Sequence, residues 1–317
     1  MRRLRNAAYK HGLIRNLERL ARGLKRLPAN APNRRGLERV DDVSYGPLPE
    51  HKLDVYRPAE RVGPCPVMIY IHGGGFQFFD KNTHWAVATK FATEGYVVFN
   101  IDYRLAPTHR YPAAVEDAAV ALKWVADNAA RFGGDINRLA LAGESAGANL
   151  VTGLAIAACW RRPEPWAVDV WQTGVLPSVL LPACGYMAVS EPQRHREAVE
   201  FAAWMESRIH NVSDSYLPGH TPALPEHDFA NPLFLLERLE SPERPFPATF
   251  AFSGDKDPVY GDTLRLKPAV ARHGSAAEAI VYPGGMHTFH MLMTTELARQ
   301  AWRDQLTFLH THMPDAP

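Results

Sequence analysis

The residues best suited to chemistry lie in the pentapeptide GESAG (143–147), which fits the pattern G-x-S-x-G. The apolar run RLALAG (138–143) precedes Ser145, and the helix-compatible segment ANLVTGLAIAA (148–158) follows it. A serine hydroxyl becomes a nucleophile where a tight turn exposes it and a neighbouring base takes its proton. The backbone of such a turn comes so close to its surroundings that the flanking residues must be small. The pattern therefore predicts a nucleophile between a strand and a helix; an ordinary turn is the alternative.

A second chemical element, HGGGF (72–76), directly follows the apolar run PVMIYI (66–71). Acyl transfer creates a negatively charged oxygen, which preorganised backbone N–H groups stabilise. Successive glycines let those groups approach a substrate without a Cβ atom in the way. The segment therefore predicts an oxyanion-binding loop, with the amide of Ala146 as a further donor at the start of the next helix. A flexible turn is the alternative.

A nucleophilic serine also needs a base and an orienting acid, which hydrolase folds supply in the order Ser, Asp or Glu, His. Asp255 and Asp257 follow one late β-rich run, and His287 and His290 follow the next. Loops at the carboxyl ends of parallel strands meet at one edge of the sheet. The residues alone leave two candidate acids and two candidate bases. No further ligands cluster near the two histidines, so we expect neither a metal nor another cofactor.

The elements that must position these residues alternate between short β-rich runs and helical stretches from Val43 onward. The runs at 66–71 and 96–101 are almost continuously apolar, which is typical of strands covered on both faces. A helix is expected from Pro112 to about Arg131. Further strands are expected at 53–58, 138–143, 175–183, 248–254 and 277–285. The pattern predicts an α/β fold with a mostly parallel central sheet flanked by helices.

The N-terminal region has an amphipathic pattern with a basic polar face. Its leucines recur at steps of four and three residues, which indicates one apolar stripe on a helix. They are Leu13, Leu17, Leu20, Leu24 and Leu27. This stripe is expected to pack on the protein's own body; contact with an anionic membrane surface or with a partner protein are the alternatives.

Residues 187–232 interrupt the alternation of strands and helices. The stretch 196–209 is compatible with a helix, and a segment rich in proline and glycine follows it. We expect an insertion above the sheet that forms a helical lid together with the N-terminal helix.

Composition and charge exclude several classes of function. The 317 residues carry a formal net charge of +1, which gives no reason to expect a nucleic-acid partner. Residues 1–40 hold 12 basic and two acidic residues, whereas the remainder holds 23 basic and 32 acidic residues. The three cysteines are too widely spaced to indicate a disulfide framework. Neither a membrane-spanning run nor a convincing signal peptide is present, so a cytoplasmic location is expected.

From about Leu53 to the C-terminus the chain resembles the hormone-sensitive-lipase-like esterases, the bacterial family IV carboxylesterases of the α/β-hydrolase superfamily. The motifs that carry the resemblance are HGGGF (72–76), DYRLAP (102–107), PAAVEDAAVALKWVADNAARFGGD (112–135), RLALAGESAGAN (138–149), NPLF (231–234), DP (257–258) and HTF (287–289). HGGGF together with DYRLAP is specific to this group.

The resemblance implies a nucleophile, an acid, a base, three oxyanion amides and two residues that support their loop. In this order they are Ser145, Asp257 and His287, then Gly74, Gly75 and Ala146, with His72 and Gly73 as support. It favours Asp257 over Asp255 and His287 over His290. The implied activity is hydrolysis of short- to medium-chain acyl esters without a cofactor. An amidase, formamidase or deacetylase of the same fold is the first alternative, and a non-catalytic binding protein is the second.

The resemblance also implies a division of the chain. Residues 1–45 would form the N-terminal part of the lid and 187–232 its second part, over a core made of 46–186 and 233–317. A homodimer is a further possibility that the sequence leaves open.

Two of the departures from the family pattern lie close to the expected site. FQFFD (76–80) stands where many relatives have a small, glycine-containing segment, so Phe76, Phe78 and Phe79 are candidate pocket residues. The two later phenylalanines would either narrow the pocket or pack under the lid. The second departure is Glu144, an acid beside the nucleophile whose expected basic partner the sequence does not identify.

Overall fold

The computed structural model describes residues 2–195, 203–217, 219 and 224–314. Its described residues form one eight-stranded sheet in the order β1-β2-β4-β3-β5-β6-β7-β8. The strands are β1 (Leu37–Ser44), β2 (Lys52–Pro58), β3 (Cys65–Ile71), β4 (Val97–Ile101), β5 (Gly134–Glu144), β6 (Pro177–Ala183), β7 (Ala248–Gly254) and β8 (Ala277–Tyr282). All pairs from β4 to β8 are parallel, whereas β2 is antiparallel to both β1 and β4. The predicted α/β fold with a mostly parallel sheet is confirmed.

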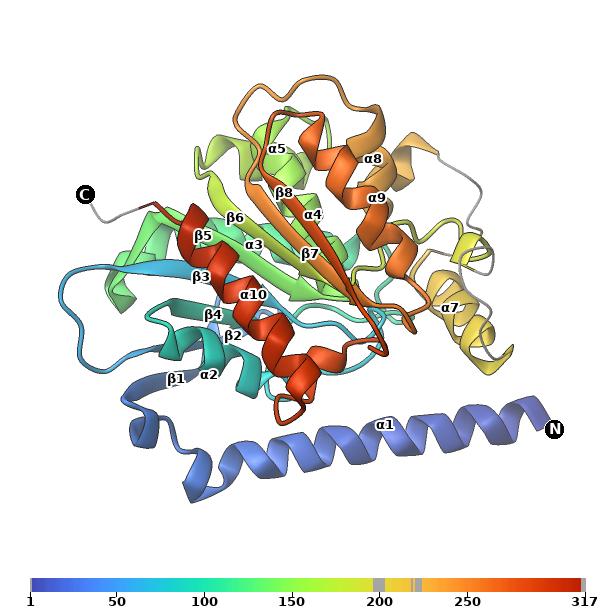
Figure 1. The fold of residues 1–317 in the computed structure, drawn as a ribbon, viewed down its shortest axis with the longest axis horizontal. Helices are drawn as coiled ribbons and strands as arrows, with labels where there is room; N and C mark the ends of the chain where they lie inside the picture. Colours follow the sequence, from blue (N-terminus) through green and yellow to red (C-terminus); the bar gives the residue numbers. More distant parts are fainter. Residues whose placement is uncertain (1, 196–202, 218, 220–223, 315–317) are drawn as a thin grey trace.

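Helices cover both faces of the sheet (Figure 1). One face packs against α3 (Ala113–Asn128), α4 (Ala146–Cys159), α5 (Pro165–Gln172), α8 (Pro232–Arg238) and α9 (Tyr260–Ala271). The other face packs against α2 (Trp85–Thr93) and α10 (Glu296–His312). Single 3₁₀ turns occupy Pro28–Asn30, Pro32–Arg35, Ala129–Phe132, Pro225–Ala230 and Phe289–Met291. The apolar strands are thus buried from both sides, as their continuous hydrophobic runs predict.

The edge strand β1 (Leu37–Ser44) lies within the segment that we expected to be helical lid. Its sequence LERVDDVS lacks a regular alternation, and its register with β2 shifts between Val40 and Val43. Asp42 has a positive φ of 57° at this irregularity. A bulge adds an unpaired residue, and charged residues are common on edge strands, so the period-two signal is lost. The core sheet therefore begins at Leu37 rather than near residue 46.

Helix α1 (Arg2–Arg26) lies along one side of the molecule (Figure 1). Its C-terminal end is tied to the sheet by the buried Lys25, whose Nζ is 2.6 Å from Asp54 Oδ2 and 3.1 Å from Asp41 Oδ1. Arg22 adds an ion pair of 2.7 Å with Asp80. These contacts place the basic helix against the protein's own body. Among the described residues, none of the helices combines the length and the apolar character needed to cross a bilayer.

Helix α7 (Ala203–Tyr216) lies in the 187–232 segment. The helix predicted over 196–209 is thus observed from residue 203, and 196–202 lie outside the described residues.

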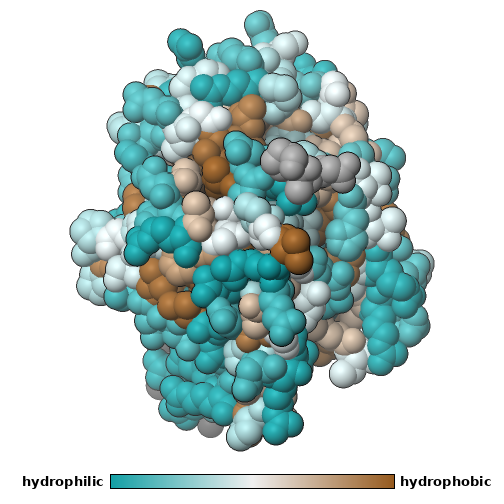
Figure 2. All heavy atoms as spheres, turned by 90° about the vertical axis from the view of Figure 1, so that its left-hand side faces the viewer, coloured by the Kyte–Doolittle hydropathy of each residue, from teal (hydrophilic) through white to brown (hydrophobic). Residues whose placement is uncertain are grey.

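At the opposite end of the molecule, Figure 2 shows a face covered mainly by hydrophilic residues, with hydrophobic residues in small separate groups.

Candidate active site

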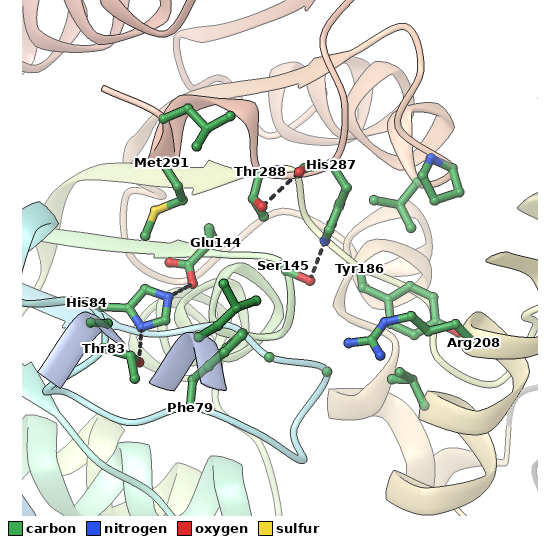
Figure 3. Close-up of a pocket in the computed structure, with 18 of the residues that line it drawn as sticks. Phe79, Thr83, His84, Glu144, Ser145, Tyr186, Arg208, His287, Thr288 and Met291 are labelled. Carbon is green, nitrogen blue, oxygen red and sulfur yellow. Dashed lines mark hydrogen bonds and ion pairs between the residues drawn. The ribbon is translucent and has the colours of Figure 1, made fainter. Parts of the chain in front are cut away.

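Ser145 stands on the turn between β5 and α4. Its backbone has φ 56° and ψ −114°, a conformation that a non-glycine residue adopts only when the surroundings impose it. A Cβ atom on Gly147 would lie 2.0 Å from the Ile71 carbonyl oxygen, so only glycine allows the turn to pack this closely against β3. The predicted strand, tight turn and helix are all present. The serine hydroxyl faces a cavity (Figure 3).

The structure brings Ser145, His287 and Asp257 together. His287 Nε2 lies 3.0 Å from Ser145 Oγ, and His287 Nδ1 lies 2.9 Å from each carboxylate oxygen of Asp257. Asp255 lies elsewhere and accepts a hydrogen bond from the Gly284 N–H. His290 is buried with its ring edge-on to an aromatic side chain. Of the two acids and two bases that the sequence left open, these geometries join Asp257 and His287 to the serine.

Electrostatics favour a charged acid beside the histidine. Burial raises the pKa of Asp257. The charge of His287 and the hydrogen bonds from His287, the Val259 N–H and the Ser253 hydroxyl outweigh this effect, so the pKa of Asp257 lies below its usual value. Burial lowers the pKa of His287, and the Asp257 carboxylate outweighs this effect and raises it. The Asp257 carboxylate thus stays ionised and accepts a hydrogen bond from the Nδ1–H of His287. The unprotonated Nε2 of His287 then faces the Ser145 hydroxyl as an acceptor.

The glycine loop lies against the turn that carries Ser145. Gly74 and Gly75 have φ values of 107° and 63°, in the left-handed region that favours glycine. Both line the same cavity as Ser145. Within the described part of the chain, the backbone N–H groups of Gly74, Gly75 and Ala146 donate to no protein acceptor. They are therefore available to a substrate oxygen.

His72 and Gly73 do not line the cavity, and their contacts lie with neighbouring residues. The His72 ring stacks on Tyr103 with ring centroids 4.5 Å apart, and the Tyr103 hydroxyl donates to the His72 carbonyl at 2.9 Å. The Gly73 N–H donates to the Glu144 carboxylate rather than to the cavity. Their placement agrees with a supporting position behind the loop.

His84 is the basic partner of Glu144 that the sequence did not identify. Its Nε2 lies 2.9 Å from Glu144 Oε1, and the buried carboxylate also accepts from the Tyr70 hydroxyl. Burial alone would raise the pKa of Glu144, but His84 and the other donors lower it to about 2. The sequence indicated only that Glu144 needs a basic partner. It could not show which of the 14 histidines fills this position.

Comparisons with known proteins agree with this geometry. Residues 68–291 match a family model described as the alpha/beta hydrolase fold. The chain belongs to this alpha/beta hydrolase family. Carboxylesterase NlhH of Mycobacterium tuberculosis strain H37Rv is 34% identical over 271 residues, which span 84% of this chain and 79% of that relative. Esterase LipI of the same strain is 31% identical over 268 residues, or 83% and 78% of the two chains.

Solved structures share the hydrolase fold. The esterase LipW from Mycobacterium marinum superposes with a TM-score of 0.75 at 27% identity, covering 94% of this chain and 88% of that one. A bacterial heroin esterase superposes with a TM-score of 0.76 at 22% identity, covering 97% and 91%, and supports the fold alone.

The cavity of this hydrolase has a volume of about 540 Å³ and is largely apolar. Helix α1 contributes Leu17, Leu20, Ala21 and Leu24, and helix α7 contributes Arg208, Ile209 and Val212. The two segments that we expected to form a lid therefore both reach the chamber that holds Ser145.

The three candidate pocket phenylalanines lie in different places. Phe79 lines the cavity (Figure 3). Phe76 is fully buried and stacks on Tyr216 with ring centroids 3.7 Å apart, so it belongs to the core. Phe78 faces a separate hollow beside Ile14. A local sequence pattern could not separate them because the loop turns sharply, with positive φ at both Phe76 and Phe79.

Proposed function

We propose that this hydrolase is a carboxylesterase that cleaves short- to medium-chain acyl esters through an acyl-enzyme on Ser145. The observation that carries the proposal is the continuous hydrogen-bonded chain from Ser145 through His287 to Asp257, beside N–H groups that are available to a substrate. The similarity to a carboxylesterase and to an esterase supports the same activity. The finer assignment to the hormone-sensitive-lipase-like group is supported by HGGGF (72–76) and DYRLAP (102–107).

In the first half of the proposed reaction, Ser145 Oγ attacks the ester carbonyl carbon while its proton passes to His287 Nε2. The carbonyl oxygen becomes an oxyanion that accepts from the N–H groups of Gly74, Gly75 and Ala146. The bond to the leaving alkoxide then breaks, and the alkoxide takes the proton from His287. Asp257 holds the imidazole and stabilises its charged form.

In the second half, a water molecule attacks the acyl-enzyme and gives its proton to His287. The collapse of the second tetrahedral intermediate releases the carboxylic acid and returns the proton to Ser145. No step requires a cofactor.

The walls of the cavity support the acyl-length part of the proposal. The chamber of about 540 Å³ is lined on one side by leucines of α1 and on another by Ile209 and Val212 of α7. We propose that α1 and the 187–232 segment act as the lid over a core that includes β1. Membrane contact by α1, a homodimer and a cytoplasmic location stay predictions.

The deciding experiment compares wild type with Ser145→Ala on aryl esters from acetate to decanoate. We expect turnover with a rapid initial release of the aryl alcohol in wild type, covalent labelling by a fluorophosphonate, and loss of both in Ser145→Ala. Ser241→Ala, an exposed serine, is the matched control. Absence of turnover and labelling in wild type would overturn the proposal, and full activity in Ser145→Ala would overturn the assignment of the nucleophile. Parallel anilides test the amidase alternative.

A further inference from the structure

Arg208 places a positive charge inside the otherwise apolar chamber. It is the only lysine or arginine among the described residues that line the cavity. Figure 3 shows its side chain extending from α7 toward Ser145. Its charge also lowers the pKa of His287, as burial does, although Asp257 outweighs both effects. Arg208 is therefore near enough to the reacting groups to contact a bound substrate.

No carboxylate of the described residues pairs with this guanidinium. The guanidinium instead contacts the ring of Phe78, whose centroid lies 5.8 Å from the guanidinium carbon. Glu144 is the only acidic residue in the described lining, and Tyr70, Gly73 and His84 already occupy its carboxylate. Burial lowers the pKa of Arg208.

Three other partly buried arginines of this chain each form an ion pair with a buried aspartate, whereas Arg244 contacts carbonyl oxygens and the Trp171 ring. The pairs are Arg104 with Asp117, Arg162 with Asp228, and Arg194 with Asp262. A cation in an apolar pocket is costly unless an anion accompanies it, and the planar guanidinium matches a carboxylate with two parallel hydrogen bonds. The chamber is thus complementary to an anion that none of the described lining residues supplies.

We propose that Arg208 binds a carboxylate of the substrate, so that the preferred esters carry a free carboxylate at a distance from the scissile bond. The substrate class would be monoesters of dicarboxylic acids or esters of hydroxy acids. This inference rests on the proposed esterase function, since it names the substrate of the same site. The apolar walls from α1 and α7 would contact the methylene groups between the two ends.

The test uses pairs of substrates that differ in charge but have closely matched size. Monoethyl glutarate against ethyl valerate places the carboxylate on the acyl side. 4-(Acetoxymethyl)benzoate against 4-(acetoxymethyl)toluene places it on the alcohol side. In wild type we expect kcat/KM to favour the charged member of at least one pair by about tenfold or more, mainly through KM, and high salt should reduce the preference.

The Arg208→Met variant should bring the favoured ratio close to one, and Arg208→Lys should restore part of it. Arg299→Met removes an exposed arginine on α10 and should keep the wild-type ratio. If wild type shows no preference in either pair, or if Arg208→Met keeps it, the inference is wrong. Because the neutral esters are measured in the same experiment, their Ser145-dependent hydrolysis would then leave the proposed function intact. The wild-type ratios test the inference even if a variant fails to fold.

Discussion

The imidazole of His84 and the carboxylate of Glu144 form a buried pair, with His84 Nε2 2.9 Å from Glu144 Oε1. Glu144 directly precedes Ser145 in the chain. The same carboxylate accepts from the Gly73 N–H, so it joins the nucleophile turn to the glycine loop. The distance between the serine and the glycine loop thus depends on a side chain that has no part in the hydrogen-bonded chain from Ser145 to Asp257. Glu144 is a positioning residue in this arrangement.

Replacing Glu144 should therefore reduce both stability and rate. Glu144→Ala leaves the His84 imidazole, the Tyr70 hydroxyl and the Gly73 N–H without their acceptor. Loss of one partner of a buried ion pair costs about 3–5 kcal/mol of unfolding free energy. Glu144→Gln keeps the shape and one acceptor oxygen, so it should lose less. Urea unfolding measures the free energy of unfolding. The value of kcat on an aryl ester shows whether the glycine loop keeps its position relative to Ser145. An alanine variant as stable and as active as wild type contradicts the role.

The same pair predicts how stability varies with pH. Burial lowers the pKa of His84, but Glu144 outweighs it and raises the pKa above the usual 6.5. A raised pKa stabilises the folded state fully below pH 6.5, and this contribution is lost as the pH rises through the folded value. Glu144, with its pKa lowered from 4.5 to about 2, contributes above pH 4.5 and loses this as the pH falls toward 2.

The unfolding free energy of wild type minus that of His84→Asn should therefore be largest between about pH 4.5 and 6.5. Chemical unfolding at several pH values gives this difference directly, and subtracting the variant removes contributions from other groups that both proteins share. A difference that stays constant from pH 4 to pH 9 would show that the pair does not titrate in this way.

The sequence could predict the residues that meet at Ser145 because each follows a strand in a recognisable local pattern. The small residues around Ser145 and the glycines after β3 reflect close backbone approach, which the structure shows at Gly147 and Gly74. The choice of Asp257 over Asp255 did not follow from residue types, since both follow β7. The conformation of the loop after β7 makes the difference: the Asp255 carboxylate accepts from the Gly284 N–H, whereas the Asp257 carboxylate faces His287.

Features that depend on packing between distant segments were beyond local patterns. His84 follows the loop after β3 and Glu144 ends β5, and the pairing of these two strands brings them together. From the sequence alone, many other histidines could have been the partner of Glu144. Arg208 enters the chamber because α7 crosses above it, and the periodicity of its segment does not show which way it faces. Strand β1 was missed because its bulge and acidic residues remove the alternation.

Gly74 should tolerate no side chain. A Cβ atom there would lie 2.1 Å from the Phe78 carbonyl oxygen, a backbone atom that cannot move without shifting the loop. Displacement of an oxyanion donor typically costs about 10²–10³ in kcat. We therefore expect Gly74→Ala to lose about this factor on aryl esters while it still folds by circular dichroism. Unchanged kcat would exclude the loop from oxyanion binding.

Gly75 offers a contrasting prediction because its neighbour is a side chain. An added Cβ would meet Val212 Cγ2 at 2.8 Å, at the contact between the glycine loop and α7. Gly75→Ala should lower kcat, and Val212→Ala in the same chain should recover part of the loss by removing the clash. The positive φ of 63° keeps the recovery incomplete. Equal rates for the single and double variants would mean that the contact with α7 does not position the loop.

Asp257→Asn should change both rate and pH profile. Catalysis needs neutral His287, so kcat/KM falls as the pH drops through the pKa of that histidine, which Asp257 holds above its usual value. Without the carboxylate charge this pKa decreases, and the acid limb of the profile should move to lower pH. The rate itself should fall by about 10⁴, the effect of this substitution in a Ser-His-Asp triad. Asp255→Asn is the matched control and should keep the wild-type limb.

Deletion of residues 1–22 tests whether α1 forms a wall of the acyl chamber. The truncated chain loses Leu17, Leu20 and Ala21 from the lining but keeps Lys25 and its ion pairs with Asp41 and Asp54. Each methylene that loses apolar contact forfeits up to about 0.8 kcal/mol of binding free energy. KM should therefore rise more for octanoate than for acetate esters.

Two parallel measurements separate this role from membrane binding by the basic helix. Leu20→Glu puts a charge on the same wall without shortening the chain, and it should flatten the chain-length profile in the same direction as the deletion. Co-sedimentation with anionic vesicles measures membrane contact independently of hydrolysis. If the deletion abolishes sedimentation but leaves the profile from acetate to octanoate unchanged, α1 serves the membrane and not the chamber. Because the α1 leucines that line the cavity are still 40% to 59% exposed, the profile is the more direct measure of what they contact during turnover.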